Sequence, residues 1–176
     1  MVLHYSRQPS NPEQSVKAKA SDVRCHYKNT LNAAHVLRGQ TIRKARRYLK
    51  DVLSRKRCVP FFRHSRHGGR CAQAKEFKAL KGRWPIKSVN ALLELLKNLK
   101  ANADHKGLTA PEMVITHVAV HRAMHQRRRT YRAHGRIGPF QSSPCHIEIQ
   151  AEKPREVVKK PESNPVQKKV CFGDLT

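Results

Sequence analysis

The chain has 176 residues and carries 37 Lys and Arg against 12 Asp and Glu, a formal net charge of +25 at pH 7. This length suits one domain with tails, and a compact body with this charge repels itself unless an anion neutralises it. No apolar run approaches the roughly 18 residues of a membrane-spanning helix, and no signal peptide opens the chain. These observations disfavour membrane insertion, and we expect a soluble intracellular protein.

The positive charge lies in the body of the chain. The segment from Ala151 onward holds six basic and four acidic residues, so residues 1–150 carry +23 of the net charge. A nucleic acid is the first partner to consider, because its phosphates neutralise Lys and Arg, and an anionic membrane surface is the second. The five cysteines form no Cys-x-x-Cys pair, so free thiols are expected rather than disulfides.

The N-terminal part shows little hydrophobic pattern. Residues 1–22 contain Pro9 and Pro12 without any hydrophobic period, which predicts an extended segment that orders only on a partner. Residues 22–28 alternate apolar and polar side chains, which predicts a short strand.

Two helices are expected next. Asn29 or Thr30 can cap the first, which would end at Gly39, and Thr41 can cap the second. The second helix has an apolar face and a basic face. A basic face is often simply solvated, but the rest of the chain is equally basic, so phosphate contact is favoured here. This face carries Arg43, Lys44, Arg46, Arg47 and Lys50, and Arg43 and Lys44 are the candidates for RNA binding.

A long irregular stretch separates the second helix from the third. It covers residues 55–84, and loops of this length inside a compact domain are usually functional. Pro85 suits the first turn of the third helix, and Gly107 suits its end. Apolar residues between Val89 and Ala103 recur at helical spacing, which is the clearest core signal in the chain. The basic candidates in this region are Arg63, Arg66, Arg70, Arg83 and Lys87.

A β-hairpin with a charged tip is expected at about residues 113–150. Residues 113–120 are rich in β-branched side chains, residues 145–149 alternate apolar and polar, and the stretch between them is basic and turn-rich. Residues 122–136 hold six arginines and no lysine, and no acidic residue lies between Glu112 and Glu148. A two-stranded ribbon of this length has little core of its own, so a polyanionic partner is expected to hold it.

The order of elements predicts an α+β domain, with helices packed on one side of a small antiparallel sheet. We expect this domain to span residues 23–151. Residues 152–176 are rich in Pro, Lys and Glu, which predicts a disordered C-terminal tail.

Two arrangements suggest other chemistry, and neither is favoured. Cys58, His64, His67 and Cys71 supply enough ligands for zinc, but their spacing matches no standard finger. The adjacent Cys145 and His146 could be imagined as a nucleophile and its base, but neighbouring strand residues point to opposite faces, and no third orienting group is evident. Cys145 is expected to face the core. No catalytic residue, metal or cofactor is predicted.

The hairpin contains the blocks Arg127-Arg-Arg-Thr-Tyr-Arg-Ala-His-Gly-Arg-Ile and Ser142-Ser-Pro-Cys-His-Ile-Glu. These blocks resemble the hairpin of one universal ribosomal protein family of the large subunit. The family is L-twenty-two, called L-seventeen in eukaryotic naming. Further blocks resemble its eukaryotic branch, among them Gly69-Arg-Cys-Ala-Gln-Ala-Lys and Gly82-Arg-Trp-Pro, and the likeness runs from about Val23 to Ile149.

The resemblance implies three helices on a three-stranded sheet with a long projecting Arg-rich hairpin, and no catalysis. It implies a structural constituent of the large subunit in cytosolic translation, which would pass through the nucleus and nucleolus during assembly. The implied partners are large-subunit ribosomal RNA, neighbouring ribosomal proteins and the nascent polypeptide, without a homo-oligomer. The implied hairpin tip, which would line the peptide exit tunnel, comprises Thr130, Tyr131, Arg132, Ala133, His134, Gly135, Arg136 and Ile137. The hairpin residues expected to bind RNA are Arg122, Arg127, Arg128, Arg129, Tyr131, Arg132, His134 and Arg136.

The residues themselves favour the same kind of partner. Arginine can grip phosphate with two parallel hydrogen bonds and can stack on unpaired bases, and structured RNA is recognised largely through its shape and its splayed bases. A basic DNA- or chromatin-packaging protein is the alternative. Such a protein more often places Lys-rich disorder in its tails, whereas the Arg-rich segment here belongs to the expected fold.

Overall fold

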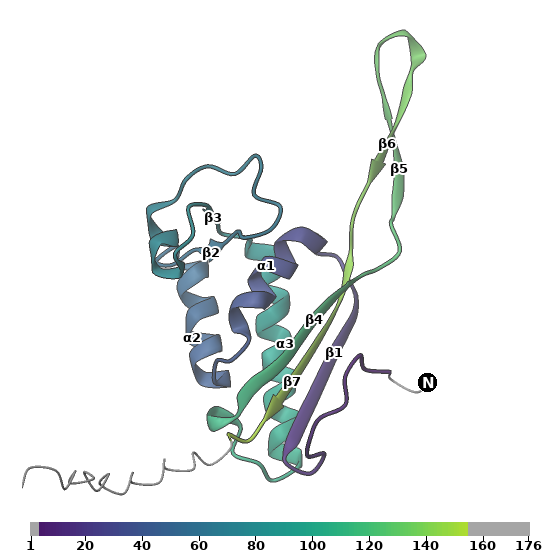
Figure 1. Cartoon of the computed structure of the whole chain (residues 1–176). Coiled ribbons are helices and arrows are strands. Elements are labelled where there is room, and N and C mark those ends of the chain that lie inside the picture. Colours follow the sequence, from purple (N-terminus) through teal and green to yellow (C-terminus); the bar gives the residue numbers. More distant parts are fainter. Residues whose placement is uncertain (1–3, 155–176) are drawn as a thin grey trace, which may run out of the picture.

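A three-stranded antiparallel sheet forms one layer of the protein, and helices cover one of its faces (Figure 1). This computed structural model describes residues 4–154. The strand order is β1-β7-β4, with β1 at Ser15–Val23, β4 at Val114–Arg122 and β7 at Cys145–Glu152. The period-two alternation of β7 turns Ile147 and Ile149 toward the helices, where both are fully buried.

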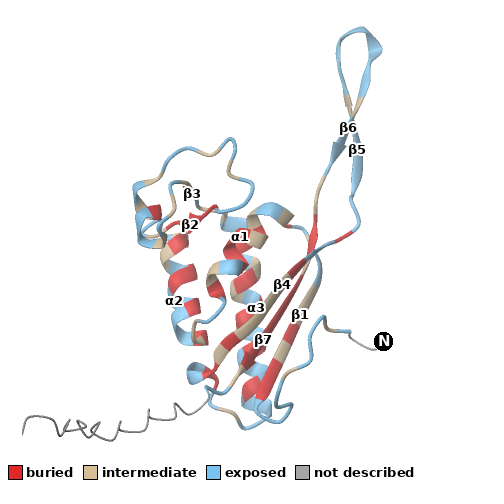
Figure 2. Cartoon of the chain, in the orientation of Figure 1, coloured by how far each residue is buried: buried red, intermediate tan, exposed pale blue. Residues whose placement is uncertain are grey.

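Three helices supply the rest of the core, namely α1 (Tyr27–Leu37), α2 (Ile42–Leu53) and α3 (Ile86–His105). α1 contacts β4, α3 contacts β1, and α2 packs on α3 and on the short 3-10 helix η2 (Ala110–Glu112). Figure 2 shows the buried residues concentrated where the helices face the sheet. The α+β fold class predicted from the sequence is confirmed.

The helix ends follow local chemistry. The Thr41 side chain accepts a hydrogen bond from the backbone N–H of Lys44 at 3.3 Å, which caps α2 as predicted. Gly107 has φ +69° directly after the end of α3, a backbone conformation that glycine adopts without a steric penalty. Among residues 4–154 no helix is both long and apolar enough to cross a membrane.

The strand predicted at residues 22–28 is wrong in position. The strand β1 begins earlier, at Ser15, and α1 already starts at Tyr27, so His26 occupies the cap position instead of Asn29 or Thr30. Val16 and Ala18 alternate with two lysines and are buried in the core. Small side chains alternating with lysines give only a weak strand signal in the sequence. This segment forms a strand because it pairs with β7.

The segment before β1 also has a place in the fold. It covers the outer face of the sheet, where Glu148 and Gln150 are buried on the side away from the helices. Ser6 donates two hydrogen bonds to the Glu148 carboxylate, from its backbone N–H at 3.0 Å and from its hydroxyl at 2.8 Å. Lys19 forms an ion pair with the same carboxylate at 3.0 Å. The expectation that this segment orders only on a partner is therefore corrected for the part that the structure describes.

The stretch expected to be irregular contains short regular elements. These are β2 (Val59–Pro60), the 3-10 helix η1 (Ala72–Phe77) and β3 (Gly82–Arg83), and β2 pairs with β3. The buried Tyr48 hydroxyl of α2 donates to the Cys58 carbonyl oxygen at 2.8 Å. Arg57 forms an ion pair with Glu76, and its guanidinium lies 4.6 Å from the centroid of the Tyr48 ring. Long-range contacts therefore fix this stretch to α2.

Beyond the sheet, the chain continues as a two-stranded ribbon of β5 (Arg127–Tyr131) and β6 (Ile137–Gln141), joined by the 3-10 turn η3 (Ala133–Gly135). Figure 1 shows this ribbon projecting away from the helices and the sheet. The predicted tail lies outside the described residues from 155 onward, and the boundaries at 22/23 and 151/152 stay predictions.

Candidate nucleic-acid interface

The ribbon has almost no buried surface. From Gln126 to Gln141 every residue is exposed except Thr130 and Gly138, which are half-buried (Figure 2). Tyr131 is 76% exposed and its cross-strand partner Ile137 is 52% exposed. Such a ribbon gains little from apolar burial in water, and its surface is free to contact a partner.

The tip closes by a left-handed turn. His134 and Gly135 have φ values of 58° and 68°, and the backbone N–H of Arg132 donates to the Arg136 carbonyl oxygen at 2.8 Å. At Gly138, an added Cβ would lie 3.2 Å from the Thr130 hydroxyl oxygen, which itself donates to the Gly138 carbonyl oxygen. Glycine therefore suits both positions, because Gly135 has a positive φ and Gly138 lies close to the Thr130 side chain.

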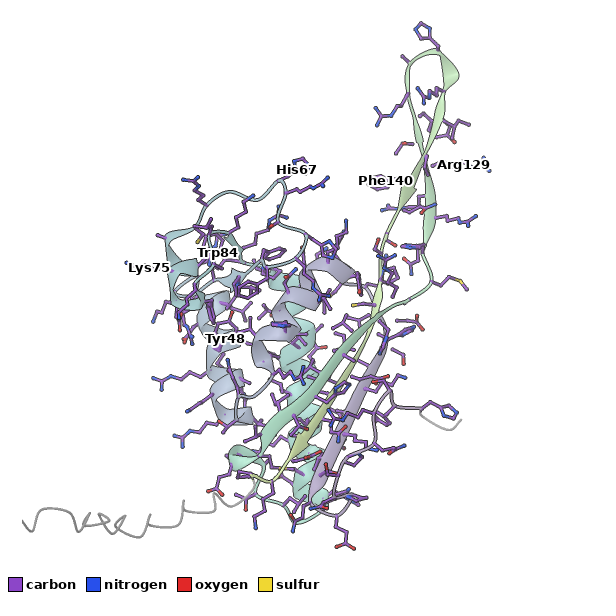
Figure 3. The ribbon with its side chains drawn as sticks, viewed as in Figure 1. Tyr48, His67, Lys75, Trp84, Arg129 and Phe140 are labelled. Atoms are coloured by element: carbon purple, nitrogen blue, oxygen red, sulfur yellow. The ribbon has the colours of Figure 1, made fainter. Side chains whose placement is uncertain are left out.

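Arginines point from both faces of the ribbon. Arg128 lies opposite Phe140, and its guanidinium is 4.9 Å from the centroid of that ring. Arg129, one residue along, belongs to the other face, and Figure 3 shows Arg129 and Phe140 on opposite sides of the ribbon. An anionic partner that neutralised all these arginines would have to surround the ribbon rather than lie along one side.

Few of the cations are neutralised internally. In the part of the chain that the structure describes, the only Lys or Arg side chains in ion pairs are Lys19 and Arg57. All the basic residues expected to bind RNA are exposed and outside these pairs. The unbalanced charge is therefore available to an external anion.

The loop between β2 and β3 presents a second basic surface. Arg63, Arg66, Arg70 and Arg83 are exposed on it. The Lys81 ammonium donates to the Ser65 carbonyl oxygen at 2.8 Å and so holds the loop against β3. Figure 3 shows His67 at the outer edge of this loop and Trp84 beneath it.

Trp84 anchors the base of the loop. The residue is half-buried, and its indole N–H donates to the Gln73 side-chain oxygen at 3.2 Å. An indole held in this way has a packing role.

A third basic surface lies between α2 and α3. A groove of about 530 Å³ has the buried Ile42 and Leu96 among its lining residues, and Arg43 at its edge. The cations that line it are Arg43, Arg46, Arg47, Lys50, Lys97 and Lys100. The sequence reasoning missed Lys97 and Lys100, although their i, i+3 spacing on the polar face of α3 could have indicated them. Lys44 is exposed on α2 but does not line the groove.

The predicted residues form several surfaces, not one site. The hairpin, the loop and α2 each carry a group of exposed cations, while Lys87 lies near the start of α3, close to the hairpin base. Arg122 lies at the end of β4, where its guanidinium is 5.2 Å from the centroid of the Tyr27 ring.

The two alternative chemistries find no support in the geometry. Among residues 4–154, no group of three His, Cys, Asp or Glu side chains is placed to hold a metal ion. Cys58 is fully buried, and burial together with the neighbouring Cys71 raises its pKa to about 12. Cys145 is fully buried, and its burial raises the pKa of the thiol, whereas His146 accepts a hydrogen bond from the backbone N–H of Asp22. The cysteine and histidine point apart, as predicted.

The exposed basic hairpin suits the binding of an anionic partner, and comparison with known proteins specifies the class of protein. Residues 18–152 match the family described as "Ribosomal protein L22p/L17e". The chain belongs to this family. It is a family of ribosomal proteins with a structural role and not a family of enzymes, so the resemblance seen in the sequence is confirmed.

Individual relatives are similar in sequence to this chain over nearly its whole length. A protein of Phlebotomus papatasi named "Large ribosomal subunit protein uL22" is 50% identical over 172 residues, which cover 97% of this chain and 92% of the relative. Proteins with the same name from Diaphorina citri and Drosophila melanogaster are also 50% identical over 172 residues. These alignments cover 97% of this chain and, respectively, 93% and 92% of the relatives.

Proposed function

We propose that this chain is a structural constituent of the large ribosomal subunit in cytosolic translation. In this role it binds ribosomal RNA, and the tip of its hairpin lines the tunnel through which the nascent polypeptide leaves. The observation that carries the proposal is the ribbon of β5 and β6, which exposes arginines on both faces and has no core. Its relatives' names place those proteins in the large subunit.

RNA is the partner that suits this ribbon. Structured RNA can enclose a projecting element between its helices, and phosphates would then reach both faces. The arginines can form bidentate hydrogen bonds to these phosphates. Arg128, stacked on Phe140, offers a cation and an aromatic ring on the same face, a combination that also suits an unpaired base.

The tip has a different composition from the arms. Between Thr130 and Ile137 it exposes Tyr131, His134 and Ile137 among the arginines. A wall that contacts many different nascent chains needs exposed groups of mixed character and no single pocket. We infer that the arms bind RNA and that the tip faces the polypeptide.

The remaining partners follow from this placement. Neighbouring ribosomal proteins would contact the parts of the surface that RNA leaves free, and the chain would reach the cytosolic ribosome after nuclear and nucleolar assembly. The sequence predicted units that divide at residues 22/23 and 151/152, but β1 (Ser15–Val23) pairs with β7, so the RNA-binding domain proposed here includes β1 and is followed by a C-terminal tail.

The RNA-binding role is tested by replacing Arg127, Arg128 and Arg129 together with Ala. Affinity for ribosomal RNA from the large subunit should fall, and the slope of log affinity against log salt should flatten by about 0.7–0.9 for each phosphate that the variant no longer neutralises. Filter binding at several salt concentrations measures both quantities. Because the ribbon adds no core, the melting temperature should not fall.

A single-charge comparison controls for net charge. Arg129→Ala and Lys153→Ala each remove one cation, but Lys153 lies at the far end of β7 from the hairpin. Arg129→Ala should flatten the salt slope and Lys153→Ala should not. Equal effects of the two substitutions would contradict a specific role for the hairpin.

A further inference from the structure

A cleft lies at the base of the hairpin, where the strand pairing is interrupted. The ladder of β4 and β7 ends at Arg122 and Cys145, and that of β5 and β6 starts at Arg127 and Gln141. The backbone between these ladders is joined by single hydrogen bonds, such as Ser142 N–H to the Gln126 carbonyl oxygen at 3.1 Å. The cleft beside this break has a volume of about 640 Å³.

The cleft brings together residues that are far apart in the sequence. Arg24 precedes α1, Lys87 lies in the first turn of α3, and Arg128 belongs to β5, yet all three line the cleft. Within residues 4–154, no acidic side chain lines it. Its cations therefore favour an anionic group, and a phosphate satisfies Lys and Arg well.

The cleft also carries neutral polar residues that can form hydrogen bonds to a ligand. Gln126 and Gln141 line it from the two arms of the hairpin. Each amide can both donate and accept hydrogen bonds, as can the edges of the nucleobases. A surface that served only to attract phosphate would need no such amides.

One polar atom at the cleft lacks a partner among the described residues. It is the Ser142 hydroxyl oxygen, which is buried and forms no hydrogen bond with them. A buried hydroxyl without a partner is unfavourable, and a rotation of the Ser142 side chain toward the cleft would let a ligand supply one. The start of α1 adds to the attraction for anions, because His26 lines the cleft and this helix has neither a side-chain cap nor an acidic residue in its first turn.

We propose that this cleft receives one nucleotide of ribosomal RNA that is extruded from its helix, with its phosphate held by Arg24, Lys87 and Arg128 and its base edge bound by Gln126, Gln141 and Ser142. The volume lies within the range of pockets that hold a small molecule. RNA is recognised chiefly where its bases are splayed out. The proposal rests on the proposed function, and it adds a place where this chain distinguishes one RNA site from another.

The test separates base recognition from charge. The double variant Gln126→Ala/Gln141→Ala removes two neutral side chains, so its affinity for ribosomal RNA of the large subunit should fall by about tenfold, which corresponds to roughly 1.4 kcal/mol of binding free energy. Its salt slope should not change, because no cation is removed. Arg24→Ala should instead flatten the slope. Gln14→Ala, at an exposed glutamine outside the cleft, is the matched control and should behave like the wild type.

Competition defines the specificity. Unlabelled homopolymeric RNA should displace the double variant from ribosomal RNA more readily than it displaces the wild type, because the variant no longer recognises the base. Thermal unfolding checks that each variant is folded, and Ser142→Ala provides a third substitution that removes no charge and should also lower affinity.

The outcomes are distinct. If the full chain binds ribosomal RNA with a steep salt slope, but the double variant and Ser142→Ala both match the wild type, the cleft holds no base and this inference is overturned while the proposed function stands. If the wild-type chain shows no preference for large-subunit RNA, the proposed function fails and the inference fails with it.

Discussion

Glu148 makes the stability of the folded state depend on pH. It is 4% exposed on the outer face of the sheet. Burial raises the pKa of its carboxyl, but the two hydrogen bonds from Ser6 and the ion pair with Lys19 outweigh burial, and the pKa lies below its ordinary value. A carboxylate with a lowered pKa contributes stability above the unfolded-state pKa, and this contribution disappears as the pH falls through the folded-state pKa.

Glu148→Gln should therefore lower stability at neutral pH by about 1.5–3 kcal/mol, the range for hydrogen bonds to a charged group. The loss should shrink as the pH falls below the unfolded-state pKa of glutamate, about 4.3, and should disappear once the pH falls through the lower folded-state pKa of Glu148. Thermal unfolding between pH 7 and pH 3 measures both. The exposed Glu112 provides the control, since Glu112→Gln should change little, and parallel pH profiles for all three proteins would refute the role of Glu148.

Tyr48 links the helical core to the loop. It is 1% exposed, burial raises the pKa of its hydroxyl, and the protonated hydroxyl donates to the Cys58 carbonyl oxygen. Its ring packs edge-on against Phe77 at a centroid distance of 5.8 Å. A buried carbonyl without its donor is left unsatisfied, which is unfavourable.

Tyr48→Phe should destabilise the protein by about 1–2 kcal/mol and should increase amide hydrogen exchange in β2 and β3. Hydrogen exchange read by mass spectrometry checks this directly. Tyr131→Phe, at the exposed tip, should leave both quantities unchanged. A loss of protection spread evenly over all three helices would mean that Tyr48 does not act on the loop in particular.

At the scale of elements, the hairpin divides into arms and tip, and the division can be tested in translating ribosomes. A photo-reactive amino acid at His134 should crosslink to the nascent chain of a stalled ribosome, whereas one at Arg128 should crosslink to RNA. The same group at Lys153, at the end of β7 away from the hairpin, should give no nascent-chain product. Nascent-chain crosslinks from Arg128 and none from His134 would reverse the assignment.

How much of each element could be predicted depends on where its signal lies. α2 and α3 carry their signals locally, in the Thr41 cap and in the spacing of Leu92, Leu96 and Leu99. β1 was misplaced because alanines and lysines form its alternation, and only pairing with β7 makes it a strand. The loop elements could not be predicted, because contacts such as that between Tyr48 and Cys58 fix them from a distance.

The candidate interface also has parts that could be predicted from the sequence and parts that could not. Exposure of the hairpin arginines could be predicted, since no acidic residue between Glu112 and Glu148 could pair with them. The cleft at the hairpin base could not, because Arg24, Lys87 and Arg128 meet only in the folded chain. A pattern along the sequence predicts a charged element, whereas a binding cleft depends on how elements pack.

For the whole molecule, the charge is the controlling property. A net charge of +25 with only two Lys or Arg side chains in ion pairs among residues 4–154 leaves strong self-repulsion. In the proposed function, RNA phosphates would neutralise this charge, and the RNA would cover the ribbon. The free chain should therefore be less stable at low salt than at moderate salt, and bound RNA should stabilise it. Thermal unfolding of the free chain across a salt series, with and without RNA, measures both effects.

The central claim is that this chain functions as part of the large ribosomal subunit through its contacts with RNA. The most direct test is a sucrose-gradient profile of cell lysate, probed for this chain, with and without magnesium chelation and with a ribonuclease control. The chain should sediment with the large subunit after the subunits separate, and extensive RNA digestion should release it. A chain that stays at the top of the gradient, or that pellets with chromatin, would contradict the claim and favour a DNA-packaging role.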